Sequence, residues 1–197
     1  MSITQDEAGA LLEKHYDRIF GAVSSGYEGY RKYPERAIHR RSTRASIVND
    51  RILAKIIEEF DEVPGTRYVE AKQSNLRFLE VGSRVLLWFK KTDLLHRPQT
   101  YPTHHAERIE SGAQLPMFPD LEILVVGYLL NKDETKVSRV SISKPDGRAR
   151  RPQWFIDLLP PQSDKLAIIP PGGGAPPSRF GRVRVKLSEP QMALFSS

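Results

Sequence analysis

The chain has 197 residues, of which 39% are hydrophobic, so it can build one ordinary hydrophobic core and would be cramped as two full domains. It contains no cysteine, which excludes disulfides, thiolate metal sites and cysteine nucleophiles and fits a reducing compartment. No apolar run approaches the roughly 18 residues of a membrane span, and the N-terminus lacks the order of a secretory signal. We therefore expect a cytoplasmic protein with no membrane partner. The net charge of +6 favours an acidic partner, either nucleic acid or an acidic protein surface.

The N-terminal region predicts an amphipathic helix followed by a linker. Thr4 and Glu7 have the spacing of a capping box, and apolar residues recur at helical spacing over residues 4–23. The next segment, SSGYEGYRKYPE, contains glycines and a proline, which predicts that the helix is interrupted there. Its tyrosines lie among cations and could stack on bases, although tyrosines that hold a linker against the core are commoner.

A second helix is predicted from the apolar spacing between Ile47 and Phe60, and Ser42 or Thr43 is placed to cap its start. The cations at its entrance are Arg40, Arg41, Arg44 and Arg51, and the acids near its end are Glu58 and Glu59. Cations near a helix N-terminus oppose the macrodipole preference. The arginines therefore form either a solvated charge run beside nearby acids or a phosphate or carboxylate site.

Residues 75–93 predict a hairpin whose second arm is a central strand. Gly82 and Ser83 fit a type II′ turn, because Gly accepts the positive φ that this turn needs first. Residues 85–89 leave no polar face, so we expect this strand to be covered on both faces. It ends in Lys90, Lys91 and Asp93, which would lie at the rim of the sheet and invite an anionic partner.

The remaining chain predicts a long loop, three further strands and a tail. Prolines limit regular structure over residues 93–120, and long irregular loops in compact domains are often functional. Strands at 121–130, 135–143 and 153–158 are joined by short turns, which indicates an antiparallel meander.

We predict an α+β fold: two N-terminal helices packed on a mainly antiparallel sheet of about six strands. A Pro/Gly-rich C-terminal extension follows the sheet. The predicted regions are 1–40 (helix and linker), 41–159 (α+β core) and 160–197 (extension).

Two groups of residues suggest a catalytic or metal-binding role as alternatives to a binding role. Asp61, Glu70 and Lys72 match the D…ExK pattern of restriction-type nucleases, in which the carboxylates hold Mg²⁺. The predicted element order lacks the helix which that fold places after its core hairpin. His96, His104 and His105 are suitable zinc ligands, but adjacent histidines cannot easily face one ion, so we expect surface histidines. No Ser-His-acid arrangement can be identified, and no cofactor or metal is expected.

Several segments together resemble an uncharacterised bacterial protein family. They read V-x-D-R-I, RVLLWFKKTD, RPQTYPTHH, QLPMFP, VVGYLLN and W-x-I-D-L, and the resemblance covers roughly residues 44–158. The resemblance carries over Asp50, Arg51, Lys90, Lys91, Asp93, Arg97, Thr103 and Gln114 as motif positions without a known chemical role. Where that family has a glutamine pair after the threonine, this chain has His104 and His105.

Genes of that family often lie beside helix-turn-helix regulators and ImmA/IrrE-type metallopeptidases, in mobile-element, stress-response or toxin–antitoxin-like settings. The resemblance therefore implies a regulatory or partner-binding role. Our hypothesis is a non-enzymatic binding or regulatory protein that engages an acidic partner through a basic surface; the alternative is the metal-dependent nuclease. The predicted binding residues are Arg40, Arg41, Arg44, Arg51, Lys90, Lys91, Asp93, Arg97, Thr103 and His105.

Overall fold

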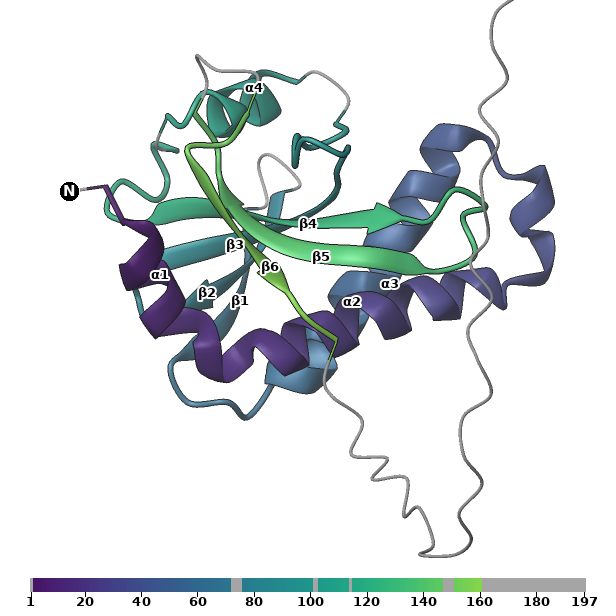
Figure 1. Ribbon diagram of the computed structural model, residues 1–197, viewed down its shortest axis with the longest axis horizontal. Coiled ribbons are helices and arrows are strands. Elements are labelled where there is room, and N and C mark those ends of the chain that lie inside the picture. The colour runs from purple at the N-terminus through teal and green to yellow at the C-terminus, as the bar shows by residue number, and fades with distance from the viewer. Residues whose placement is uncertain (1, 72–75, 101–102, 114, 147–150, 161–197) are drawn as a thin grey trace, which may run out of the picture. The chain divides into compact units, whose positions relative to one another are not determined.

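The computed structural model describes residues 2–71, 76–100, 103–113, 115–146 and 151–160, which belong to one compact unit (Figure 1). The helices are α1 (Gln5–Leu12), η1 (Glu13–His15), α2 (Tyr16–Arg31), η2 (Pro34–Ile38), α3 (Arg41–Phe60) and α4 (His104–Glu110), where η marks a 3₁₀-helix. The strands are β1 (Thr66–Ala71), β2 (Leu76–Val81), β3 (Val85–Lys91), β4 (Glu122–Leu130), β5 (Val137–Lys144) and β6 (Trp154–Leu158).

The six strands form one sheet in the order β1-β2-β3-β4-β5-β6. Every neighbouring pair is antiparallel except β3 and β4, which run parallel with Val85 opposite Glu122 and Lys91 opposite Tyr128. A parallel pair needs a crossover connection, and residues 92–121 supply it. The predicted hairpin and the predicted three-strand meander are both confirmed.

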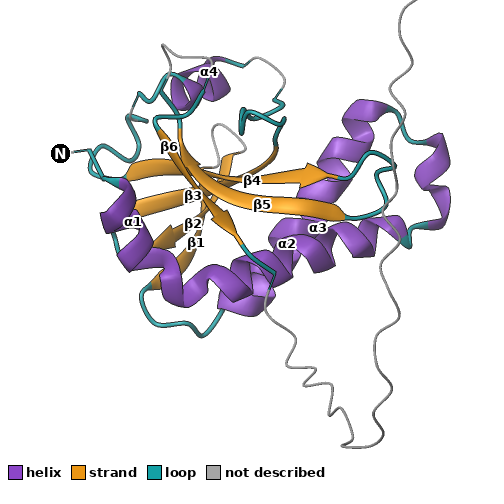
Figure 2. Ribbon diagram, viewed as in Figure 1, coloured by secondary structure: helices purple, strands orange, loops and turns teal. Residues whose placement is uncertain are grey.

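The sheet separates two apolar clusters. Helices α1 to α3 cover one face, where Ile19, Ile52 and Leu87 are fully buried. Helix α4 covers the other face, where Phe78 and Leu86 are fully buried (Figure 2). Alternate residues of β3 belong to the two clusters, because successive side chains of a strand point to opposite faces. The prediction that this strand is covered on both faces is confirmed.

Helix α2 continues through the glycine-containing segment to Arg31, so the predicted interruption there was wrong. Gly26 is buried because α3 packs against it: a Cβ at Gly26 would lie 2.6 Å from the Cα of Ile52. Tyr27 and Tyr30 point into the core and are only 4% and 3% exposed. The glycine therefore serves the close packing of two helices, and these two tyrosines are core residues.

Two local predictions about caps and turns were also wrong. Helix α3 begins directly after Arg40, its N-cap residue, and no side-chain cap is formed there, because Ser42 and Thr43 already lie inside the first turn. At the hairpin, both Gly82 (φ 62°) and Ser83 (φ 51°) have positive φ. That is the pattern of a type I′ turn, in which both central residues are left-handed.

The predicted loop at 93–120 contains helix α4. Thr103 caps it, since its hydroxyl oxygen accepts a hydrogen bond from the Ala106 backbone N–H at 3.2 Å. The helix fits here because residues 103–115 contain no proline. A helix thus follows the core hairpin, as the restriction-type nuclease fold requires. The prediction that no helix follows the hairpin was wrong. Element order alone supplies no catalytic group.

The predicted α+β class, with helices packed on a mainly antiparallel six-strand sheet, is confirmed. The Pro/Gly-rich extension lies outside the described residues. No helix in the described part of the chain combines the length and the apolar composition that crossing a bilayer requires.

Candidate functional site

Glu134, in the turn between β4 and β5, is the centre of a group of cations. Lys91 Nζ at the end of β3 donates to its carboxylate at 2.8 Å, and Arg44 Nη1 on α3 lies 3.4 Å away. The Tyr27 hydroxyl donates to the Glu134 carbonyl oxygen at 2.6 Å. Asn131 braces the same turn, because its side-chain oxygen accepts from the backbone N–H of Thr135 at 2.7 Å. The turn, α2, α3 and β3 therefore meet at one point.

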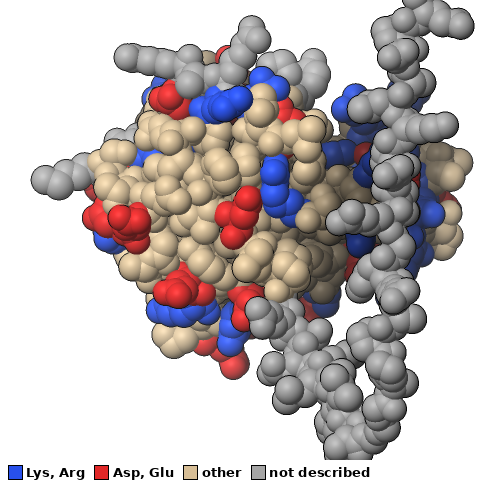
Figure 3. All heavy atoms as spheres, in the orientation of Figure 1, with Lys and Arg blue, Asp and Glu red and all other residues tan. Residues whose placement is uncertain are grey.

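The electrostatics of this point are dominated by positive charge. The hydrogen bond from Lys91 lowers the pKa of Glu134, partial burial opposes that shift, and the charges of Lys91, Arg44 and Arg41 lower it further. Arg36 lies close enough to influence the pKa of Tyr27, which burial raises. We call the following five residues the basic patch: Arg36, Arg40, Arg41, Arg44 and Lys91. Figure 3 shows Lys and Arg atoms gathered over this end of the α2–α3 pair.

The start of α3 adds to this positive character. Its first turn contains no acid, and the N-cap residue Arg40 makes no side-chain cap. The first backbone N–H groups of a helix lack intrahelical partners and favour an anion. Arg40 and Arg41 are exposed beside them. Predicted residues from the second helix and from the central strand are thus brought together here.

Lys90 does not join the basic patch. Lys91 follows Phe89 onto the helical face, whereas Lys90 lies on the opposite face with its Nζ 4.7 Å from the centroid of the Trp88 ring. Burial, and then the charge of Arg77, lower the pKa of Lys90. The predicted pairing of the two lysines in one site is therefore wrong for Lys90.

Three further predicted residues lie elsewhere. Arg51 is exposed on α3, about 10 Å along the axis from Arg44. Arg97 is bound locally, with Nη2 2.6 Å and Nε 2.7 Å from Asp93 Oδ2. The pair stabilises its own turn, because Asp93 Oδ1 also accepts from the backbone N–H groups of Leu95 (2.8 Å) and Arg97 (3.0 Å). These local contacts give both Asp93 and Arg97 a structural role that needs no binding partner.

Thr103 is the N-cap residue of α4 and His105 lies within that helix, on the face of the sheet opposite to α2 and α3. Thr103 is explained by its capping hydrogen bond. Gln114, a position carried over from the family resemblance, lies outside the described residues.

The nuclease residues are not brought together. Asp61 is the C-cap residue of α3, whereas Glu70 lies near the far end of β1, about 13 Å of strand beyond Thr66. Glu70 instead faces Arg77, which also binds Asp50 at 2.8 Å. Lys72 lies outside the described residues. Within the described residues, no group of three or more acidic or histidine side chains could hold a metal ion.

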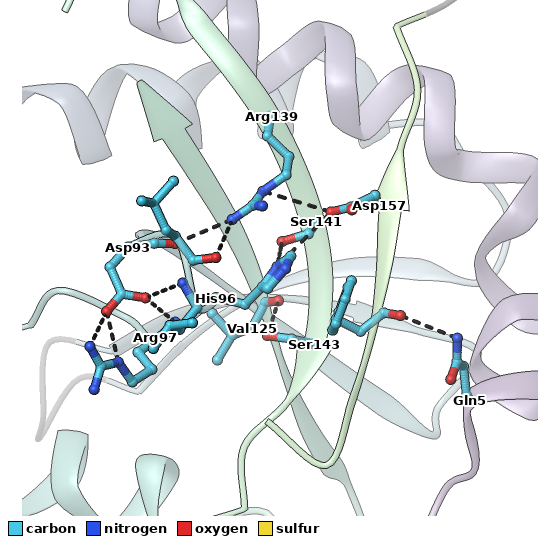
Figure 4. A network of polar contacts seen from close by, with 12 residues as sticks. Gln5, Asp93, His96, Arg97, Val125, Arg139, Ser141, Ser143 and Asp157 are labelled. Atoms are coloured by element: carbon cyan, nitrogen blue, oxygen red, sulfur yellow. Dashed lines mark hydrogen bonds and ion pairs between the residues drawn. The ribbon is translucent and has the colours of Figure 1, made fainter. Parts of the chain in front are cut away.

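A second polar network surrounds His96, which the sequence led us to expect at the surface (Figure 4). The ring is 7% exposed and stacks on Phe155 with centroids 3.9 Å apart. Its Nδ1 lies 2.9 Å from Ser141 Oγ and 4.0 Å from Asp157 Oδ1. Burial, and then the charge of Arg139, lower the pKa of His96. The expectation of a surface histidine was wrong here, because residues 93–97 fold back over β5 and β6.

This network is not a catalytic triad. A triad needs the serine at one ring nitrogen of the histidine and the acid at the other, but here both lie at Nδ1. Ser141 is also only 1% exposed on the face of the sheet. A cavity of about 300 Å³ adjoins the network, lined by charges of both signs that include Arg97, Glu107, Asp146 and Arg151. Sequence reasoning missed this network, since its members come from three distant segments.

Comparisons with protein-family models, with curated proteins and with solved structures return no match to this chain. The described residues contain two polar sites, the basic patch around Glu134 and the network around His96. Of these, the basic patch has the clearest chemistry.

Proposed function

We propose that the protein is a non-enzymatic binding or regulatory protein that engages an acidic partner through the basic patch. The single observation that carries this proposal is the gathering of Arg41 and Arg44 from α3 and Lys91 from β3 around the one carboxylate of Glu134. One carboxylate cannot neutralise three cations, so the patch keeps a surplus of positive charge. Such a surplus steers and binds anionic groups.

The geometry supports binding better than catalysis. Glu134 and its cations sit on a rigid frame, because α2 and α3 pack without a gap at Gly26 and the turn is hydrogen-bonded to Tyr27. Preorganised cations lose little entropy when a partner binds. The partner is an acidic protein surface or a nucleic acid in the cytoplasm. The resemblance to the bacterial family adds a metallopeptidase-type or regulator protein as one candidate.

The test measures binding of the purified full chain to two anionic probes, poly-L-glutamate and duplex DNA. Arg41→Gln/Arg44→Gln should weaken binding to at least one probe about tenfold at 100 mM salt. The matched control, Lys14→Gln/Arg84→Gln, removes the same charge from residues that are exposed beyond the other end of α2. Equal losses in both variants would show a diffuse charge effect and reject the patch as the site.

The second candidate is a metal-dependent nuclease. The helix α4 after the core hairpin fits the element order of that fold, although Asp61 and Glu70 do not come together. Incubation of the purified chain with DNA or RNA and Mg²⁺ or Mn²⁺ tests it. Cleavage that is lost in Glu70→Ala would support this candidate, and intact nucleic acid after prolonged incubation would exclude it.

A further inference from the structure

The connection between α2 and α3 presents an isoleucine to solvent among the cations of the basic patch. Ile38, at the end of η2, is 78% exposed, and η2 contains no buried residue. Arg36 and Arg40 lie two residues to either side of it, and both are exposed. Figure 1 shows this connection beyond the ends of the strands, at the tip of the helical pair. We call residues 34–41 the tip.

The tip is an ordered element. The Arg36 backbone N–H donates to Tyr33 at 3.3 Å, and the His39 N–H donates to Arg36 at 3.4 Å. The His39 ring packs near the Tyr33 ring at 5.5 Å and the buried Tyr30 ring at 6.3 Å, both measured between centroids. Its backbone and rings thus hold Ile38 outward. A partner bound to the exposed side chains of Arg36 and Arg40 would therefore also contact Ile38 between them.

The chemistry of the tip suits a partner in which phosphate groups alternate with apolar groups. Four of the five cations of the basic patch are arginines, whose planar guanidinium groups bind phosphate oxygens through two parallel hydrogen bonds. Nucleic acid also places apolar sugar and base edges between its phosphates, which suits an isoleucine between arginines. A single 3₁₀ turn is narrow enough to enter a duplex groove about 12 Å wide.

We propose that the tip binds nucleic acid, with Arg36, Arg40 and Arg41 on backbone phosphates and Ile38 on base or sugar edges. This inference rests on the proposed function and names its partner class. The two side-chain types make separable contributions. Phosphate contacts release counterions and make affinity fall with salt, whereas an apolar contact does not change that dependence.

The experiment titrates the full chain against a fluorescent 20-base-pair DNA duplex and a single strand of the same length, from 50 to 300 mM NaCl. Arg40→Gln/Arg41→Gln should make the slope of log affinity against log salt shallower by about 1.8 on the duplex and about 1.4 on the single strand. Ile38→Ser should weaken binding about five- to tenfold and leave the slope unchanged. The matched control is Ile57→Ser, at another exposed isoleucine that lies on α3 and is 41% exposed. It should leave both affinity and slope unchanged.

Several results would overturn the inference. The first is the absence of binding to either DNA probe at 50 mM salt. The second is an unchanged slope of log affinity against log salt in Arg40→Gln/Arg41→Gln, and the third is an equal loss of affinity in Ile38→Ser and Ile57→Ser. Binding to poly-L-glutamate that depends on the basic patch, without binding to DNA, would refute the nucleic-acid partner and leave the proposed function standing. If neither polymer binds, both proposals fail. Thermal melting of each variant, followed by circular dichroism, checks that these exposed substitutions leave the fold intact.

Discussion

Replacing Glu134 by Gln should destabilise the protein slightly while it strengthens binding of an anionic partner. The carboxylate holds Lys91 at 2.8 Å and Arg44 at 3.4 Å, and its side chain is 43% exposed. Ion pairs this exposed contribute about 0.2–1 kcal/mol each, so two of them give a loss near 1 kcal/mol. For a chain of this size that loss lowers the melting temperature by about 2–4 °C.

The same substitution frees both cations for a partner. The slope of log affinity for duplex DNA against log salt should steepen by about 1–2 in Glu134→Gln. Asp133→Asn removes the same charge from the adjacent, exposed residue and should change neither quantity. Because the pKa of Glu134 is lowered in the folded protein, its stabilising effect is present above its unfolded pKa of about 4.3 and is lost as pH falls through the folded value. An unchanged slope, with the expected loss of stability, would refute the reasoning that Glu134 competes with the partner.

Three further predictions concern the packing of α2 on α3, the buried histidines and the turn at Asp93. Gly26→Ala should lower the free energy of unfolding, measured by urea titration, by about 1–3 kcal/mol, because its Cβ would lie 2.6 Å from the α3 backbone; Gly21→Ala, with no described atom within 4 Å, should stabilise by up to about 1 kcal/mol. Burial lowers the pKa of His15 and His96, so the free energy of unfolding should fall as pH drops below about 6.5. The urea midpoint should therefore be lower at pH 5.5 than at pH 7.5, and His15→Phe should make this difference smaller. Asp93→Asn should raise hydrogen exchange in residues 94–97 without changing anion binding, since its contacts are local.

Much of the fold could be predicted from periodicity. The apolar spacing of α3 and the uninterrupted apolar run of β3 led directly to the elements observed. The wrong predictions concern residues whose structural role depends on contacts with distant parts of the chain. Gly26 suggests a break when read locally, yet it allows two helices to touch. Helix α4 has only 7 residues, too few for a helical period to be visible among the surrounding prolines.

The candidate site was partly predictable. Cations of α3 and Lys91 were expected together and do gather around Glu134, but the role of that acid depends on a turn about 90 residues away from Arg44. The period of two in a strand already predicts that Lys90 and Lys91 point to opposite faces of the sheet. Arg97 could have been paired with Asp93 by their spacing of four residues. The buried position of His96 depends on Ser141 and Phe155 and has no local signal.

The single parallel contact in the sheet has a consequence for how the chain folds. β1-β2-β3 and β4-β5-β6 are each joined by short connections, so both can assemble from neighbours in sequence. The seam between β3 and β4 must instead wait until the 30 residues from 92 to 121 close into a loop, which costs chain entropy before any contact offsets it. We expect pulse-labelling during refolding to find amides along this seam protected last; simultaneous protection of all six strands would contradict this order.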